Sequence, residues 1–147
     1  MTEVLFYHLT ESRVEQALPG LLERSLERGW KAVVQCGSEE LRDILDEHLW
    51  TWRDDGFLPH AADGAEPERN PVWLTTSDDN PIAANVRFLL DDAKPKDTGD
   101  YDRVILMFDG HDAVAVAKAR EHWKTQKNAG HHLAYWQQDG GRWVKKG

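Results

Sequence analysis

The first 50 residues alternate between short apolar stretches and amphipathic stretches, and this order restricts the fold more than any other feature. The segments "VLFYHL" (4–9) and "KAVVQCG" (31–37) are short, apolar and typical of buried strands. After each of them, residues 12–29 and 39–52 carry apolar side chains at helical spacing. Parallel strands need a long crossover connection, so the order strand-helix-strand-helix predicts a parallel sheet flanked by helices.

Local signals predict where the helices begin and end. Ser38 and Asp112 stand before helical stretches and are expected to cap their first turns. Gly29 and Gly130 follow such stretches and are expected to end them. Pro19 lies inside the first stretch and predicts a kink or a restart of the helix there.

The rest of the chain continues the same alternation. A third helix is expected at 113–129, whereas the Gly/Pro/Asp-rich stretch 53–71 is expected to be an irregular loop and the tail "GGRWVKKG" to fray. Further strands are expected at 72–76, 86–92, 103–110 and 132–138. The sequence therefore predicts an α/β fold: a single three-layer domain over residues 1–147, with a mostly parallel sheet flanked by helices.

Motifs for nucleotide or metal chemistry are mostly missing. The segment "HLTESRVEQ" after the first strand has no glycine-rich phosphate loop, so the fold is expected to be Rossmann-like without a nucleotide-binding glycine loop and without a cofactor. Paired acids such as Asp78–Asp79 point to opposite faces of an extended chain and are best interpreted as solvated loop charge. Asp109, at a strand end, keeps a metal-dependent phosphohydrolase or nuclease as the alternative function. A nucleotide-binding regulatory domain is a third hypothesis.

Charge is distributed unevenly along the chain. The formal net charge is -8, but residues 118–147 hold seven Lys/Arg against two acids, a local net charge of +5. Strong binding to DNA phosphates needs a basic surface, so a local basic patch on an acidic body suits a short acidic peptide better than a duplex. No apolar run has the length of a membrane helix. The N-terminus does not resemble a secretory signal, and the single cysteine, Cys36, allows no internal disulfide, so we expect a cytoplasmic protein.

The expected helix 113–129 concentrates this positive charge around one tryptophan. At about 100° per residue, one stripe roughly 100° wide holds three cations, one aromatic and one small apolar residue. These residues are Arg120, Lys124, Lys127, Trp123 and Val116. One interpretation is a solvated charged face with Trp123 as a packing residue, and the other is the edge of a binding pocket. The opposite side, expected to face the sheet, holds Ala115, Ala119, His122 and Gln126.

A second group of large apolar residues lies in "LWTWRDDGFLPH" (49–60), around a helix end and the loop that follows. Its members include Trp50, Phe57 and Pro59. Aromatic residues on a loop often anchor a partner protein. They can equally fold back on the protein as a small satellite core, and the sequence leaves both interpretations open.

Several of these segments resemble the chi subunit of bacterial DNA polymerase III holoenzyme. The resemblance covers nearly the whole chain, and its most specific parts are "LDEHLWTWRDDGFLPH" and "AREHWKTQKNAG". It implies a three-layer α/β fold without nucleotide chemistry and an accessory, non-enzymatic role in the clamp-loader assembly. It also implies three partners: the acidic, Phe-terminated tail of single-stranded DNA-binding protein, the psi subunit or clamp loader, and a repair helicase that uses an overlapping surface in some members.

The resemblance also implies roles for individual residues. Arg120 matches the tail-binding arginine of the family, and Trp123 and Lys124 match the aromatic residue and the lysine that follow it. Lys127 is nominated by helical spacing alone. Val116 stands where the family can have another cation, one helical turn before the arginine, so we expect a different tail affinity in this chain.

The psi-facing surface of the family carries over to the second apolar group. Trp50 matches its aromatic residue in the "LW" segment and Phe57 matches the phenylalanine of "F-x-PH", which includes Pro59 here. Residues 77–100 resemble the family less, and no role is carried over to them.

Overall fold

Local interactions fix the ends of the helices in the computed structural model. It describes residues 3–50, 61–62, 71–77, 82–90, 101–140 and 142–146, without the side chains of 50, 61 and 62. The helices are α1 (Val14–Glu27), α2 (Glu39–Trp50) and α3 (Ala113–Asn128). As predicted, the Ser38 hydroxyl accepts a hydrogen bond from the Leu41 amide at 3.2 Å, and Asp112 caps α3. Gly29 and Gly130 follow α1 and α3 with φ of 81° and 85°, a conformation that glycine adopts readily.

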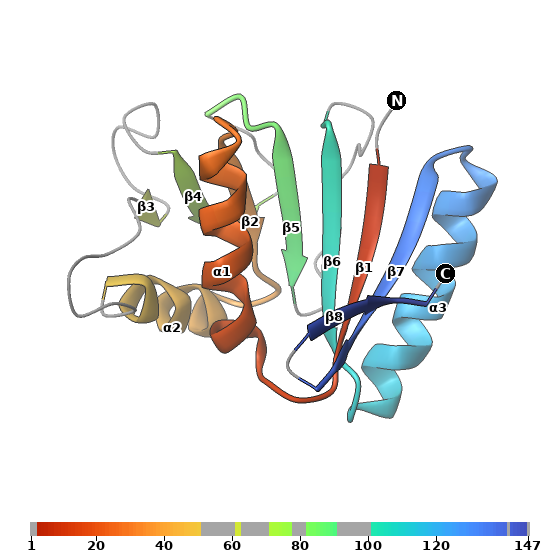
Figure 1. Ribbon diagram of the computed structural model, residues 1–147. Coiled ribbons are helices and arrows are strands. Elements are labelled where there is room, and N and C mark those ends of the chain that lie inside the picture. The colour runs from red at the N-terminus through yellow and green to blue at the C-terminus, as the bar shows by residue number, and fades with distance from the viewer. Residues whose placement is uncertain are drawn as a thin grey trace.

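Within the described residues, eight strands form one mixed sheet, in which every pair is parallel except β7 with β8 (Figure 1). Their spatial order is β3-β4-β2-β5-β6-β1-β7-β8. The strands are β1 (Glu3–Leu9), β2 (Ala32–Gln35), β3 (Ala61–Ala62), β4 (Val72–Thr75), β5 (Val86–Leu90), β6 (Arg103–Asp109), β7 (His132–Asp139) and β8 (Arg142–Lys145). The central strands β2, β4 and β5 are buried along their whole length, as expected for parallel strands covered on both faces.

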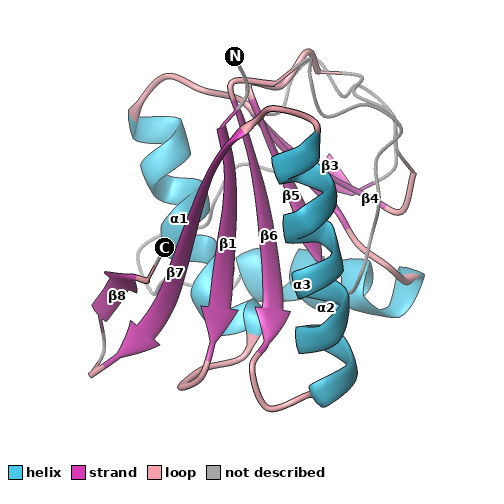
Figure 2. Cartoon of the chain, turned by 90° about the vertical axis from the view of Figure 1, so that its right-hand side faces the viewer, coloured by secondary structure: helices cyan, strands magenta, loops and turns pink. Residues whose placement is uncertain are grey.

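The helices cover the two faces of the sheet unequally. In Figures 1 and 2, α1 and α2 lie on one face and α3 on the other. The larger core packs under α1 and α2 and includes the fully buried Leu18 and Leu22 of α1. The smaller core packs under α3 and includes Phe6 of β1 and Ala119 of α3. The predicted three-layer α/β architecture is therefore confirmed.

Two predictions of local structure were wrong, and a third was wrong in part. At Pro19, where a kink or a restart was predicted, the restart does not occur, because α1 continues as one helix whose neighbouring leucines are buried in the core. The stretch expected to be irregular contains the short strand β3. The tail expected to fray forms β8, since Gly140 has φ of 60° and allows the chain to turn back on β7. Trp143 of β8 then packs on the Tyr7 ring at a centroid distance of 4.7 Å.

A buried arginine connects strands β2 and β5 to the segments around them. Arg87 of β5 has no exposed surface, and its Nε and Nη2 donate to the Gln35 side-chain oxygen at 2.9 and 2.6 Å. Its Nη1 donates to the Tyr101 hydroxyl at 2.9 Å, and Nη2 also donates to the Ser77 carbonyl at 2.8 Å. A buried charge is tolerated only when it is well hydrogen-bonded. The partners of Arg87 must therefore keep their positions, and this holds the surrounding part of the sheet in one geometry.

Among the described helices, none is both long and apolar enough to cross a membrane.

Candidate functional site

Helix α3 holds the predicted cationic stripe against the sheet. The Asp112 carboxylate accepts from the amides of Val114 and Ala115 at 3.0 and 3.3 Å, which fixes the first turn. The helix packs on β6, β1 and β7 (Figure 2). Ala119 is buried at the contact, as the helical spacing predicts, while Arg120 next to it is exposed. The side chains of α3 are therefore presented from a fixed helix.

Trp123 lies at the border between the sheet and the cations, as predicted. Its ring meets Phe6 edge-to-face at a centroid distance of 5.2 Å and Tyr135 at 6.0 Å. The residue is nevertheless only half-buried. Trp123 therefore packs on the sheet, as the first interpretation expects, and part of its apolar surface stays exposed.

Three of the other four residues of the stripe place positive charge next to this tryptophan, and the fourth is apolar. Arg120, Lys124 and Lys127 are exposed, and Val116 is half-buried. Exposed cations next to a partly covered aromatic ring can bind a ligand that carries both an apolar group and negative charge. The structure thus presents all five predicted residues on one helix.

A group of aromatic residues on the sheet, beneath α3, was missed by sequence reasoning. His8 Nδ1 lies 2.5 Å from the Tyr135 hydroxyl oxygen, and the His8 ring is 4.9 Å from that of Phe108. Burial raises the pKa of Tyr135, and the charge of Arg120 opposes this rise. Arg120 therefore acts on the same site as these rings. Side chains alternate between the two faces of a strand, so His8 lies on the same face as Phe6. This alternation predicts that His8 lies near Tyr135 only when the register is known, which pairs Phe6 with Tyr135.

Gly110 allows the His8 ring to occupy its position. A Cβ added to Gly110 would overlap the His8 ring and press on the Leu9 carbonyl oxygen. We expect Gly110→Ala to lower the free energy of unfolding by about 1–2 kcal/mol, because the ring or the backbone must move. Urea unfolding would measure this. Gly20→Ala is the matched control, since nothing lies within 4 Å of a Cβ there. Equal stability of the Gly110→Ala protein and the wild type would contradict the close packing.

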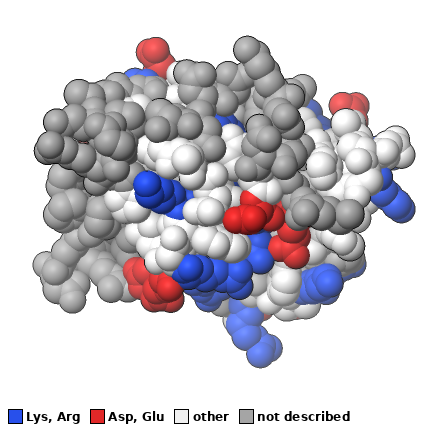
Figure 3. Space-filling model, turned by 90° about the horizontal axis from the view of Figure 1, so that it is seen from above, with Lys and Arg blue, Asp and Glu red and all other residues white. Residues whose placement is uncertain are grey.

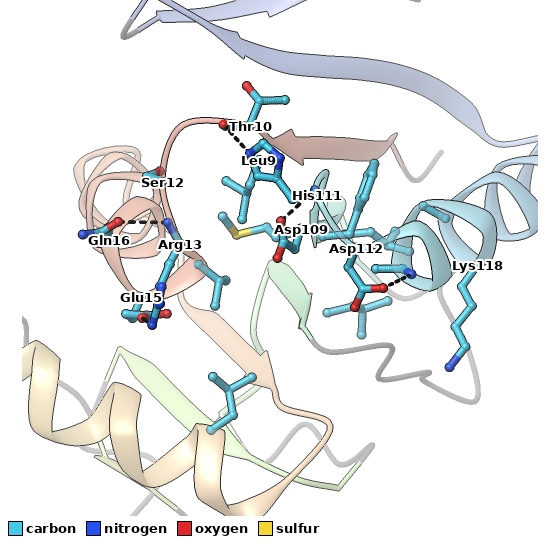
Figure 4. A pocket seen from close by; sticks show the side chains of 18 of the residues that line it. Leu9, Thr10, Ser12, Arg13, Glu15, Gln16, Asp109, His111, Asp112 and Lys118 are labelled. Atoms are coloured by element: carbon cyan, nitrogen blue, oxygen red, sulfur yellow. Dashed lines mark hydrogen bonds and ion pairs between the residues drawn. The ribbon is translucent and has the colours of Figure 1, made fainter.

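A cavity of about 800 Å³ lies on the other flank of α3 (Figure 4). It opens at the carboxyl ends of β1 and β6, where α1 leaves toward one side of the sheet and α3 toward the other, a place where α/β folds often bind ligands. The α3 residues that line it include none of the five stripe residues and are Val114, Ala115, Lys118, Ala119 and His122. The cavity and the predicted site are therefore two separate features of one helix.

The polar groups of this cavity hold its own loops in place. The His111 amide donates to Asp109 at 2.9 Å, and His111 Nε2 lies 2.8 Å from the Thr10 carbonyl oxygen (Figure 4). Over the described part of the chain, no group of three or more His, Cys, Asp or Glu side chains could hold a metal ion.

The second predicted surface lies mostly outside the described residues. The backbone of Trp50 ends α2, but its side chain is not described, and neither Phe57 nor Pro59 is. Elsewhere on α2, the Ile44 side chain is 53% exposed. The choice between a partner surface and a satellite core stays a prediction.

Comparison with known proteins agrees with the resemblance seen in the sequence. The chain is 25% identical over 91 residues to the probable DNA polymerase III subunit chi of Rickettsia prowazekii, covering 61% of this chain and 55% of that protein. It is 31% identical over 77 residues to the DNA polymerase III subunit chi of Pseudomonas aeruginosa, covering 50% and 54%. The chain thus spans about half the length of these relatives. A model of the family described as DNA polymerase III chi subunit, HolC, matches residues 1–134. With most of its length matched, the chain belongs to the DNA polymerase III chi subunit family, whose members are accessory subunits of the replicative polymerase.

Proposed function

We propose that this chain is a non-catalytic, cytoplasmic adaptor that binds the acidic C-terminal tail of single-stranded DNA-binding protein. Through psi or the clamp loader, it links that protein to the polymerase assembly during DNA replication. The observation that supports this most is the stripe on α3, where exposed Arg120, Lys124 and Lys127 surround half-buried Trp123 and Val116. No cofactor is needed for this role.

The chemistry of the stripe suits a peptide that ends in phenylalanine. The terminal Phe packs between Trp123 and Val116, and its carboxylate binds the planar guanidinium of Arg120 through two parallel hydrogen bonds. Lys124 and Lys127 meet the aspartates that precede it. Exposed ion pairs are individually weak and screened by salt, so we expect modest affinity for one tail. Several tails on one DNA-bound oligomer would raise the effective concentration and offset this weakness.

The charge of the whole protein argues against DNA as the direct ligand. The formal net charge is -8. On the face seen in Figure 3, Lys and Arg side chains are interspersed with acidic ones. Elsewhere a cation is already paired, since Arg103 Nε lies 2.7 Å from a Glu3 carboxylate oxygen. A discontinuous set of cations releases few counterions from a phosphate backbone.

The surface around Trp50, Phe57 and Pro59 is proposed as the contact for psi or for a repair helicase. Support comes from the family resemblance.

Titration of a labelled acidic peptide ending in Phe tests the proposed function. We expect binding that weakens as salt rises, and roughly tenfold weaker binding when the terminal carboxylate is converted to an amide, because the bidentate contact with Arg120 is lost. A peptide with the same charges but with a terminal Ala is the second comparison, and it tests the apolar contact with Trp123. Equal affinity for the acid and the amide would exclude recognition of the chain end.

A further inference from the structure

His8 and Tyr135 form a titratable pair directly beneath the α3 stripe. His8 Nδ1 lies 2.5 Å from the Tyr135 hydroxyl oxygen, and the Tyr135 ring in turn contacts Trp123. Both residues are half-buried. The charge of Arg120 acts on each of them, so the pair lies within the electrostatic reach of the residue that the proposed function assigns to the peptide carboxylate.

The surroundings of His8 determine where its proton lies. The Nε2 edge of the ring faces Gly110, and the Gly110 backbone favours the charged form of the ring. A backbone carbonyl favours this form by accepting a ring proton, so we assign the proton of the neutral ring to Nε2, which leaves Nδ1 as the acceptor. The Tyr135 hydroxyl then donates to His8 Nδ1, and its proton is not available to another group.

Protonation of His8 reverses this hydrogen bond. In the imidazolium both ring nitrogens are donors, so Nδ1–H donates to the Tyr135 oxygen. The Tyr135 hydroxyl then keeps its proton but no longer donates it to His8, so it can donate a hydrogen bond to another acceptor. The same step adds a positive charge beside Arg120.

We propose that Tyr135 is a further binding residue for the carboxylates of the acidic peptide, and that the protonation state of His8 controls whether its hydroxyl can donate to them. With neutral His8 the hydroxyl is engaged and the peptide is bound by the α3 stripe alone. With protonated His8 the hydroxyl donates to a peptide carboxylate, and the new charge adds to the attraction. This inference rests on the proposed function and makes peptide binding dependent on protons.

The groups around His8 set the direction of the pH dependence. Burial lowers the pKa of His8; the Gly110 hydrogen bond raises it, the charges of His111 and Arg120 lower it, and the Asp109 carboxylate raises it. The net result is a pKa below the ordinary value near 6.5, so His8 is mostly neutral at neutral pH in the free protein. A bound carboxylate stabilises the imidazolium and raises the pKa of His8 in the complex. Affinity therefore increases as the pH falls through the pKa of the complex.

The test compares peptide affinity at pH 7.5 and pH 5.5 at constant ionic strength, with the free-acid peptide that ends in Phe. The peptide aspartates, with a pKa of about 3.9, stay ionised at both values. We expect the wild-type Kd to fall roughly three- to tenfold at pH 5.5, as for one added hydrogen bond to a charged group in a partly exposed site. Calorimetry at pH 6 in two buffers of different ionisation enthalpy should show proton uptake on binding.

Two substitutions separate His8 and Tyr135 from the other histidines. His8→Asn keeps an acceptor for the Tyr135 hydroxyl but cannot titrate, and Tyr135→Phe removes the donor. We expect less than a twofold change in Kd between the two pH values for each, with folding verified by thermal unfolding. His132→Asn removes an exposed histidine from the same strand as Tyr135 and should keep the wild-type gain.

The outcomes distinguish this inference from the proposed function. A wild-type Kd that is the same at both pH values, or a full gain retained by His8→Asn, would overturn the role of the pair and leave the adaptor function standing. Absence of peptide binding at either pH, or equal binding of the acid and the amide, would refute the proposed function and this inference with it.

Discussion

Replacing Arg87 with alanine is expected to lower the free energy of unfolding by about 3–5 kcal/mol, because a buried polar network loses its central donor. The side chain has no exposed surface and donates to Gln35, Tyr101 and Ser77. In the Arg87→Ala protein these acceptors lose the guanidinium donor, and the alanine side chain is too small to fill the space that the arginine leaves. The change should appear as a lower urea midpoint at an unchanged slope.

Arg142→Ala provides the control for this measurement. Arg142 is an exposed arginine on β8, and its loss should change stability by less than about 0.5 kcal/mol. Arg87→Met keeps much of the side-chain volume but removes the charge, so it separates the effect of the lost charge from the effect of the lost volume. If Arg87→Ala were as stable as the Arg142→Ala control, the network would not be holding β2 and β5 together.

Arg87 also illustrates what one sequence cannot reveal. In "VRFLL" it is a single charged residue within an apolar strand, and period-two alternation alone would point it to solvent. Its partners Gln35 and Tyr101 lie 52 and 14 residues away, on segments whose positions depend on the strand order. The sequence predicted a parallel sheet but not that order, so the burial of this arginine could not be inferred.

The α3 stripe was predictable because the period of a helix is a local property. Helical spacing correctly placed Ala119 toward the sheet, Trp123 at the border and Arg120 outside. His8 and Tyr135 were missed because they are 127 residues apart and meet only through the pairing of β1 with β7. The face on which a residue of a helix lies can be predicted from its position in the sequence. Contacts between strands can be predicted only when the strand pairing and its register are known.

Strand β8 was missed for a different reason. Its sequence is short, with a charged residue at each end, so neither apolar alternation nor length marked it as a strand. The glycines that precede it were the available signal, because Gly140 adopts a positive φ of 60° in the turn. Trp143, which packs on Tyr7, gives the strand an apolar contact with the core.

For peptide binding, Arg120→Ala is expected to weaken the affinity for the acidic, Phe-terminated peptide by about 1.5–3 kcal/mol, from the loss of a charge-assisted, bidentate contact. Peptide titration at low salt measures the change, and Arg120→Glu should weaken binding further by repelling the aspartates. Lys118→Ala is the matched control, since Lys118 is exposed on the same helix but lines the cavity on its other flank. Loss of binding in both variants alike would indicate a general charge effect.

A double-mutant cycle decides whether Arg120 reads the end of the peptide or only its charge. Wild type and Arg120→Ala are each titrated with the free-acid and the amidated peptide. If the guanidinium binds the terminal carboxylate, Arg120→Ala costs much less affinity toward the amide than toward the acid, and the two changes are not additive. If Arg120 contributes only long-range attraction, the two losses add and both shrink together as salt is raised. Non-additivity that persists in salt would therefore identify Arg120 as the residue that recognises the chain terminus.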